Sequence, residues 1–352
     1  MSENEPGQLC GQAFFLYLLW RITVNDKRIK TMKRRKFLET SAITASMISL
    51  FPAELSSMIR EIRKGKLERR VLGQTGEMLS LIGFGGIVVM DATSEQASAR
   101  VGEAIDYGVN YFDVAPTYGN AELMLGPALK PYRKDVFLAC KTTERNKEGA
   151  RRELEQSLLN MQTDHFDLYQ LHAVTEMKDV DTIFSKGGAM ETFLEARKEG
   201  KVRFLGFSAH SVEAALALMD RFDFDTILFP FNFACWYAGD FGPQVMQTAK
   251  DKNMGILALK AMAYRPWEEG EERTVSKAWY RPLMEEEEAK KGLRFTLSHP
   301  VTSAIPPGNE DLFAMALRLA VDFKEMNPEE ILAMKKKGLE TEPLFSYSRP
   351  TN

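Results

Sequence analysis

Short apolar runs alternate with longer amphipathic stretches along most of this chain. Eight runs have the length of buried strands: Leu81–Gly85, Asn110–Asp113, Asp135–Lys141, His165–His172, Val202–Ser208, Thr226–Phe229, Gly255–Lys260 and Thr302–Pro306. Between them, the spacing predicts helices over Glu95–Tyr107, Lys147–Met161, Ala189–Glu199, Val212–Arg221 and Pro243–Lys252. Eight strands that alternate with helices over about 250 residues predict an α/β fold, the (β/α)8 TIM barrel.

A glycine-containing turn bears on the main alternative, an open doubly wound sheet. That fold usually carries the pattern G-x-G-x-x-G after its first strand. Here Gly83–Val88 begins in the same way but lacks the third glycine, so we favour the barrel. Ahead of the first barrel strand, Glu68–Val71 and Leu79–Ile82 flank a turn with two glycines, which predicts an N-terminal β-hairpin.

The composition is that of an ordinary globular chain, and it excludes several classes of protein. The 352 residues are 44% hydrophobic and 27% charged, with a net charge of −3. A general nucleic-acid binder needs a strong basic surplus, so we expect no nucleic-acid partner. No apolar run reaches the roughly 18 residues of a stable membrane span. The 3 cysteines and 4 histidines lack the spacing of a disulfide framework or a zinc site, so no metal is predicted.

The first 66 residues differ in character from the rest. From Met32, a basic segment with Arg34 and Arg35 precedes a modestly apolar stretch, Phe37–Phe51. Twin arginines before such a stretch resemble a bacterial twin-arginine export signal. This interpretation implies the twin-arginine translocation machinery as a partner and a periplasmic or exported protein. The alternative is a basic amphipathic helix that belongs to the fold of a cytoplasmic protein.

We accordingly divide the chain into three parts. Residues 1–66 are the leader, 67–322 are the barrel, and 323–352 are a C-terminal helix, expected over Pro328–Lys337, with a tail. Within the barrel part, residues 264–292 interrupt the alternation with a mostly charged segment that includes Trp267, Trp279 and Tyr280. This segment is either a solvated loop that leads into a charged helix, or a lid whose aromatic side chains close over a ligand.

Polar residues end four consecutive strands of the predicted barrel. They are Asp113, Lys141, His172 and Ser208, and each lies about one βα unit from the next. The carboxyl ends of barrel strands converge on one face, where the active sites of such barrels are built. Adjacent strands therefore bring these side chains together, and Tyr118 lies in the loop that follows Asp113.

A tyrosine, a lysine, an aspartate and a histidine together make a proton donor. A phenol has an ordinary pKa near 10, and a buried ammonium close to Tyr118 would lower that pKa by favouring the phenolate. A lowering by three pKa units corresponds to about 4 kcal/mol. An aspartate keeps the ammonium charged, and a histidine orients a carbonyl or hydroxyl oxygen. Such a donor serves a developing alkoxide, and the hydride has to come from a cofactor.

Six segments resemble the aldo/keto reductase family of nicotinamide-dependent (β/α)8 barrels. Their sequences are RVLGQTG, SLIGFGG, YFDVAPTYG, LACKT, DLYQLH and GKVRFLGFS, at Arg70–Gly76, Ser80–Gly86, Tyr111–Gly119, Leu138–Thr142, Asp167–His172 and Gly200–Ser208. They follow the family's order within residues 68–320. The resemblance implies an oxidoreductase that transfers a hydride between a nicotinamide cofactor and a small carbonyl or alcohol substrate, such as an aldehyde, a ketone or a sugar.

The resemblance also implies a role for each site residue. Tyr118 would be the general acid, Lys141 would tune its pKa, Asp113 would pair with the lysine, and His172 would orient the substrate. The implied cofactor contacts are Gly85, Gly86, Ser208, Asn232, Ile305, Pro306 and Gly308. Of these, Ser208 matches a serine that contacts the nicotinamide carboxamide. The loop that ends at Gly308 matches one that holds the adenosine phosphates beside a helix N-terminus.

Several positions depart from the family pattern around the nicotinamide. Ala209 stands where many members have an asparagine. Leu228 lies where a glutamine is usual, with Asn232 a few residues further on. The tyrosine that often stacks on the nicotinamide ring is replaced by Leu259 or Lys260. The cofactor pocket is therefore expected to be atypical, although the four catalytic positions match.

The phosphate loop departs as well. NADP-using members carry basic residues after this loop for the 2′-phosphate, whereas Asn309, Glu310 and Asp311 follow it here. Two carboxylates beside a phosphate are repulsive. NADP(H) is expected as the family default, and NAD(H) is the alternative.

Two other functions fit part of the sequence. A non-turnover nucleotide-binding sensor or accessory protein would use the same barrel, but it would not need the acid–base group. A barrel hydrolase would use Asp113 and Glu122 as paired carboxylates, but it would leave Lys141 and Tyr118 without a role. Cys140 alternates with Lys141 on its strand and is expected to pack in the core.

The leader predicts where the expressed chain begins. If translation starts at Met32, N-terminal sequencing of the protein from its own host will find no peptide from residues 1–31. A peptide from residues 1–31 in the expressed protein would contradict a translation start at Met32.

Overall fold

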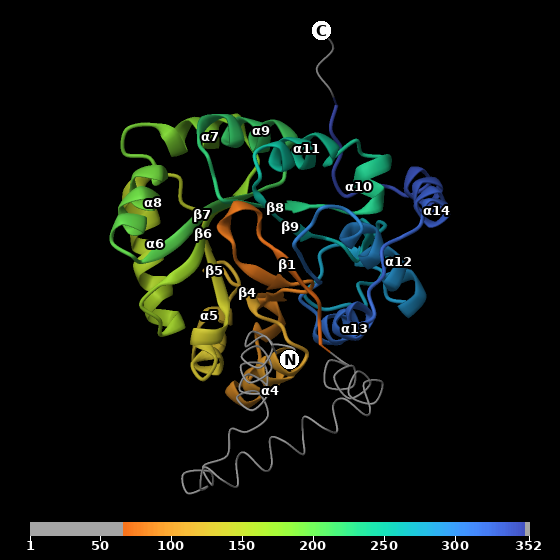
Figure 1. The fold of residues 1–352 in the computed structure, drawn as a ribbon, viewed down its shortest axis with the longest axis horizontal. Coiled ribbons are helices and arrows are strands. Elements are labelled where there is room, and N and C mark those ends of the chain that lie inside the picture. Colours follow the sequence, from red (N-terminus) through yellow and green to blue (C-terminus); the bar gives the residue numbers. More distant parts are fainter. Residues whose placement is uncertain (1–65, 349–352) are drawn as a thin grey trace, which may run out of the picture. The chain divides into compact units, whose positions relative to one another are not determined.

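Eight parallel strands form the wall of a barrel in the computed structural model, which describes residues 66–348 (Figure 1). Each strand overlaps one of the eight predicted runs. The strands are β3 (Phe84–Gly85), β4 (Tyr111–Asp113), β5 (Phe137–Thr142), β6 (Phe166–Val174), β7 (Val202–Ala209), β8 (Thr226–Pro230), β9 (Gly255–Leu259) and β12 (Ser303–Ile305).

The strands pair side by side in chain order, and the chain closes the sheet on itself. A parallel bridge joins Ile82, just before β3, to Ala304 in β12. The backbone N–H of Gly83 donates to the carbonyl of Ala304 at 3.0 Å, and the N–H of Ala304 donates to the carbonyl of Leu81 at 2.8 Å. The prediction of a (β/α)8 barrel is therefore confirmed, and the open doubly wound sheet is excluded.

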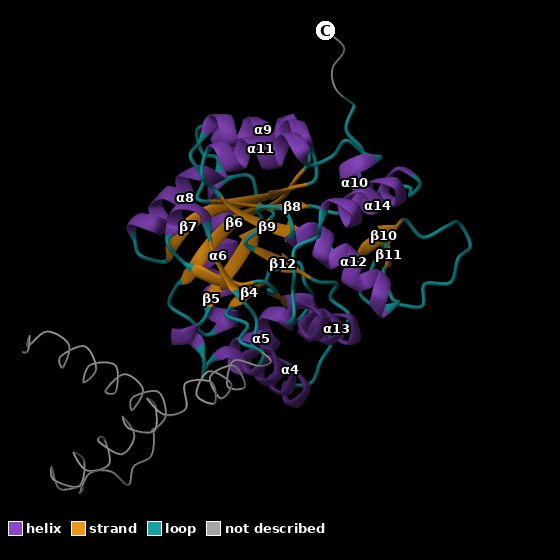
Figure 2. Cartoon of the chain, turned by 45° about the vertical axis from the view of Figure 1, so that its right-hand side comes forward, coloured by secondary structure: helices purple, strands orange, loops and turns teal. Residues whose placement is uncertain are grey.

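Helices surround the strands on the outside (Figure 2). They are α4 (Ser94–Asp106), α5 (Ala121–Leu129), α6 (Lys147–Met161), α7 (Met177–Phe184), α8 (Ala189–Lys198), α9 (Val212–Arg221), α10 (Phe233–Tyr237), α11 (Pro243–Asp251), α12 (Glu286–Leu297), α13 (Glu310–Val321) and α14 (Pro328–Leu339). Side-chain caps explain several of the starts: Thr93 accepts from the N–H of Gln96 before α4, and Asn146 accepts from the N–H of Gly149 before α6.

The predicted N-terminal hairpin covers one end of the barrel. Its strands β1 (Arg69–Val71) and β2 (Met78–Ser80) pair antiparallel. The N–H of Gln74 donates to the carbonyl of Asn253, and the N–H of Ser80 donates to Oδ1 of Asn110, at 2.9 and 2.8 Å. Both acceptors precede barrel strands, so the hairpin covers the amino-terminal end. Its fully buried leucines, Leu72 and Leu79, pack in one cluster with the residues that fill the barrel. These are Tyr111, Phe137, Ala139, Leu168, Leu228, Leu257 and Ile305.

The charged segment 264–292 is more ordered than a plain loop. It contains most of a short antiparallel pair, β10 (Ala263–Arg265) and β11 (Arg281–Pro282), and then begins α12. Three glutamates, Glu286–Glu288, occupy the first turn of this helix, where negative charge interacts favourably with the helix dipole.

The C-terminal part continues from the barrel into α14 and a tail. In that tail the ring of Phe345 stacks on the rings of His210 and Phe241, with ring centroids 5.2 Å apart in both pairs. The tail therefore packs beside the barrel strand ends. Across residues 66–348, no helix combines the length and hydropathy that crossing a bilayer requires. The predicted export signal with Arg34 and Arg35 lies outside the described residues.

A buried carboxylate ties the amino-terminal ends of three strands together. Asp167 in β6 lies 3.1 Å from Nη1 of Arg133 and 2.6 Å from Nη1 of Arg203, and it accepts from the N–H of Leu138 at 2.9 Å. Its side chain is 5% exposed. These contacts lie at the end of the barrel opposite the polar strand ends.

Replacing Asp167 by Ala should lower the free energy of unfolding by about 3 kcal/mol, because two arginines and a buried N–H lose their acceptor. Urea unfolding measures this loss. Asp164→Ala is the control, since the side chain of Asp164 is 94% exposed, and it should change stability by less than about 0.5 kcal/mol. Equal effects of the two substitutions would contradict this account.

Candidate active site

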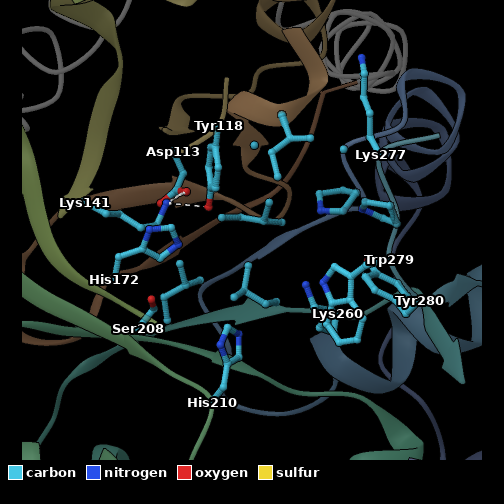
Figure 3. A pocket seen from close by; sticks show the side chains of 18 residues that line it. Asp113, Tyr118, Lys141, His172, Ser208, His210, Lys260, Lys277, Trp279 and Tyr280 are labelled. Atoms are coloured by element: carbon cyan, nitrogen blue, oxygen red, sulfur yellow. Dashed lines mark hydrogen bonds and ion pairs between the residues drawn. The ribbon is translucent and has the colours of Figure 1, made fainter. Parts of the chain in front are cut away.

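A cavity of about 270 Å³ lies at the carboxyl ends of the barrel strands. Asp113, Lys141, His172 and Ser208, from β4, β5, β6 and β7, all line it, and so does Tyr118 from the loop after β4 (Figure 3). The barrel thus brings these five predicted residues together. The remaining lining residues are Gly85, Ile87, His210, Leu228, Leu259, Lys260, Lys277, Trp279, Tyr280, Ile305, Pro306, Pro307 and Gly308.

Asp113 and Lys141 form a buried ion pair in this cavity. Their side chains are 2% and 1% exposed, and Nζ of Lys141 contacts Oδ1 of Asp113. The same Nζ lies 3.2 Å from the carbonyl of Val114 and 3.4 Å from Oη of Tyr118. Burial alone would lower the pKa of Lys141, but the charge of Asp113, its hydrogen bond to the lysine and the nearby Tyr118 together outweigh burial and hold this pKa above its ordinary value. The lysine therefore carries a positive charge next to the phenol.

The protonation of Tyr118 differs from the sequence-based expectation. Burial raises its pKa, and this outweighs the lowering by Lys141. The expectation considered the ammonium but not the desolvation of the phenolate, which is larger in this pocket. Tyr118 thus keeps its proton at neutral pH, which suits a general acid.

His172 faces Tyr118 edge to face, with ring centroids 5.7 Å apart. Burial, with a contribution from the nearby Lys141, lowers the pKa of His172 to about 3. The imidazole is therefore neutral at physiological pH and can donate one hydrogen bond. Its Nδ1 lies 3.5 Å from Oγ1 of Thr117.

Two residues that hold Asp113 in place were missed by the sequence analysis. The phenol of Tyr111 donates to Oδ2 of Asp113 at 3.0 Å, and Nε2 of Gln170 donates to the same oxygen at 3.2 Å. Each precedes a site residue by two positions, Tyr111 before Asp113 and Gln170 before His172. Residues two apart on a strand share a face, so this spacing was the signal that could have found them.

The predicted cofactor contacts divide into two groups. Gly85, Ser208, Ile305, Pro306 and Gly308 line the cavity, which runs from Tyr118 to the loop after β12. The other two, Gly86 and Asn232, are absent from its lining. The side chain of Asn232 caps α10, where its Oδ1 accepts from the N–H of Cys235 at 2.9 Å.

The glycines of the cavity wall permit a close approach of the chain. A Cβ on Gly308 would lie 2.2 Å from Cγ2 of Ile87, and a Cβ on Gly85 would lie 2.9 Å from Cγ2 of Ile305. Larger residues would therefore push these segments apart. The cavity joins an acid–base group at one end to this tight loop at the other. Lys260 and Lys277 line it in addition to Lys141, which fits an elongated anionic ligand such as a dinucleotide.

Cations neutralise the carboxylate that follows the phosphate loop. Glu310, at the start of α13, lies 3.0 Å from Nη2 of Arg100 in α4 and 3.4 Å from Nζ of Lys277. The expectation of two uncompensated carboxylates is therefore corrected for Glu310. Two basic groups stand beside this loop after all, although they come from distant parts of the sequence.

The segment 264–292 reaches the cavity. It contributes Lys277, Trp279 and Tyr280 to the lining, and Figure 3 shows these side chains across the cavity from the tetrad of Asp113, Tyr118, Lys141 and His172. Asn309 Nδ2 and Ser276 Oγ lie 3.3 Å apart, so the segment also contacts the phosphate loop. A loop that is only solvated would not line the pocket, so that interpretation does not account for these contacts of segment 264–292.

The residues of the hydrolase alternative lie apart. Glu122 is absent from the cavity lining, and its Oε2 accepts from Nδ2 of Asn160 at 2.8 Å. Cys140 is buried beside Glu122, with Sγ 3.6 Å from Oε1, and is packed as expected. Among residues 66–348, no group of histidine, cysteine or carboxylate side chains could hold a metal ion.

A comparison of the sequence with known families identifies the one to which the chain belongs. The sequence profile of the Aldo/keto reductase family matches residues 81–301, more than half of the chain. The chain belongs to the aldo/keto reductase family. It is thus an oxidoreductase by family, and the predicted resemblance is confirmed.

Individual relatives are more distant. L-galactose dehydrogenase of Arabidopsis thaliana is 30% identical over 215 residues, which are 56% of this chain and 66% of that enzyme. An aldo-keto reductase of Bacillus subtilis is 29% identical over 54% of this chain and 61% of its own length. Each match therefore spans less than two thirds of the relative.

A solved structure supports the fold. The holo form of an aldo-keto reductase from Bacillus halodurans superimposes with a TM-score of 0.63 at 23% identity, over 80% of this chain and 99% of its own. At 23% identity, this similarity shows that the two chains share the (β/α)8 barrel fold, and it shows nothing about function.

The buried ion pair predicts a coupled effect on stability. Asp113→Asn should lower the free energy of unfolding by about 3 kcal/mol, because the Lys141 ammonium stays buried without its counter-charge. Lys141→Met in the same chain should restore at least about 1 kcal/mol of that loss. Urea unfolding of the two single variants and the double variant measures the coupling. Additive losses would show that the two side chains do not depend on each other.

Proposed function

We propose that this chain transfers a hydride between a nicotinamide cofactor and a carbonyl or alcohol, such as an aldehyde, a ketone or a sugar, with Tyr118 as the general acid and base. The observation that carries the proposal is the 3.4 Å approach of Lys141 Nζ to Tyr118 Oη inside the cavity. Membership of the aldo/keto reductase family supports the same reaction class.

Proton transfer follows from the electrostatics around Tyr118. During reduction, negative charge develops on the substrate oxygen, and the phenol donates its proton there. The phenolate left behind is stabilised by the Lys141 ammonium, which Asp113 keeps charged and in place. In the oxidation direction the same phenolate takes the proton from the alcohol.

His172 would position the substrate oxygen. Its neutral imidazole lies beside Tyr118 and can donate a hydrogen bond to a carbonyl oxygen without adding a charge to the cavity. Two donors on one oxygen fix its orientation toward the proton that it receives.

The cofactor would supply the hydride. Gly85, Ser208, Ile305, Pro306 and Gly308 are the residues proposed to hold it. Ser208 Oγ accepts from the N–H of Ala173 at 2.8 Å, so its hydroxyl proton stays available for a ligand acceptor. NADP(H) is the family default, and Arg100 with Lys277 beside the phosphate loop would suit its extra phosphate. Glu310 competes for both cations, so NAD(H) is the alternative.

A nucleotide-binding sensor that does not turn over is the second candidate. Ala209 and Leu228 replace the asparagine and the glutamine that the family pattern places beside the nicotinamide. A pocket that binds the nucleotide but presents its nicotinamide poorly would show binding without catalysis.

We further propose export by the twin-arginine route, which the Arg34–Arg35 pair supports. This route carries folded proteins, so the cofactor would be loaded in the cytoplasm. A cofactor that stays bound through successive reductions and oxidations would suit a periplasmic location.

Tyr118→Phe should reduce turnover of aldehydes and sugars by about 100-fold or more, because the phenol's proton is lost. The dissociation constants of NADPH and NADH should stay within about threefold of wild type. In the wild type, reduction should fall and oxidation should rise only as the pH passes above the ordinary pKa of tyrosine, since the pKa of Tyr118 is raised.

The assays use purified protein from residue 54 onward, with calorimetric titrations for binding. Unchanged turnover in Tyr118→Phe would contradict the assigned role. Tight nucleotide binding without turnover on any substrate would favour the sensor.

A further inference from the structure

Lys260 stands directly after β9, at the edge of the cavity. Its backbone is in the left-handed region, with φ at 67°, which is costly for a residue with a side chain. In the sheet, Leu259 pairs with Ile305, so Lys260 follows β9 beside the start of the phosphate loop after β12. The side chain lines the cavity (Figure 3).

The ammonium of Lys260 has aromatic neighbours but no counter-charge. Its Nζ lies 5.4 Å from the ring centroid of Trp279 and 4.9 Å from that of Tyr280. Within residues 66–348 no carboxylate forms an ion pair with it, whereas the other cavity lysines, Lys141 and Lys277, pair with Asp113 and Glu310. Burial lowers the pKa of Lys260 to about 8. A cation in such surroundings gains more than an exposed one from a nearby anion.

His210 adds a second polar group beside Lys260. Its Nε2 is buried and makes no hydrogen bond within the described part of the chain, and its ring stacks on Phe345. Burial, with a contribution from Lys260, lowers the pKa of His210 to about 4, so the imidazole is neutral. The two side chains line the same cavity and are not used by the acid–base chemistry of Tyr118.

We propose that Lys260, assisted by His210, is the anion-binding residue of this pocket, and that it receives a phosphate or carboxylate oxygen of the bound ligand. The aromatic rings of Trp279 and Tyr280 hold the ammonium in place between ligands. An anionic oxygen then supplies the counter-charge that the chain itself lacks, and the neutral imidazole donates one hydrogen bond to the same group.

Two ligands could bring that oxygen. One is the diphosphate bridge of the cofactor, because Lys260 lies beside the loop assigned to the phosphates. The other is an anionic group on the substrate, such as the carboxylate of a sugar acid. The proposal rests on the proposed function for the identity of these ligands, and it adds a residue to the pocket that the family pattern fills with other side chains.

The nucleotide arm of the test measures binding by calorimetry on the full chain. ADP-ribose and NADPH are titrated into wild type, Lys260→Met and Lys260→Arg. If Lys260 binds the diphosphate, the methionine variant should lose at least tenfold in affinity for both ligands, and the arginine variant should recover most of it. ADP-ribose has no nicotinamide, so this readout does not depend on turnover.

The substrate arm uses D-glucuronate and D-glucose 6-phosphate, with D-glucose as the neutral match, titrated into protein saturated with NADP⁺. If Lys260 binds a substrate anion, Lys260→Met should lose at least tenfold in affinity for an anionic sugar and none for glucose. Nucleotide affinity should then stay unchanged.

Lys337→Met is the matched control. Lys337 also lies over two aromatic rings, at 5.8 Å from Phe233 and 5.7 Å from Tyr264, but it lines a separate groove. It should leave every affinity unchanged. Urea unfolding checks that the Lys260 variants are folded.

Either pattern supports the proposal and identifies the source of the anion. Affinities in Lys260→Met that match wild type in both arms would overturn it, and so would a wild-type protein that binds none of these anions. A loss of ADP-ribose affinity in a protein without any turnover would uphold Lys260 and reject the proposed function.

Discussion

The site depends on one interaction, the buried ion pair between Asp113 and Lys141. Burial lowers the pKa of a lone ammonium and raises that of a lone carboxylate, so each of the two charges would be destabilised on its own. Together they stay charged, and the pair places a fixed positive charge 3.4 Å from the phenol of Tyr118. Tyr111 and Gln170 donate hydrogen bonds to the same carboxylate, so Asp113 cannot turn away from the lysine. Every proposed proton transfer uses this arrangement.

The barrel makes the ion pair possible because Asp113 and Lys141 lie at the carboxyl ends of two paired strands. β4 and β5 are hydrogen-bonded neighbours, and apolar side chains fill the interior of the barrel. Closing the sheet between Ile82 and Ala304 brings the phosphate loop round to the same cavity. The proposed catalytic residues at the strand ends thus lie on the barrel wall, whereas segment 264–292 adds Lys277, Trp279 and Tyr280 from outside it.

Much of this could be predicted because its signal is local. Strands and helices follow from the spacing of apolar residues, and the four polar strand ends follow from the barrel count. What could not be predicted depends on contacts across the fold. Arg100 pairs with Glu310 across 210 positions, and this pairing changes the charge beside the phosphate loop. The raised pKa of Tyr118 comes from burial, which the residue types do not reveal. The side chain of Asn232 caps α10, a role for which asparagine is among the preferred residues.

The most direct test of the account follows the hydride itself. The protein is incubated with NADPH and NADH that carry deuterium at the nicotinamide C4 position, together with a panel of aldehydes and sugars, and the products are examined by mass spectrometry. We predict that the alcohol from at least one substrate gains a single deuterium on the former carbonyl carbon. Bound nucleotide with no deuterated product from any member of the panel would contradict the account, because the pocket would then hold a nucleotide without using Tyr118 for chemistry.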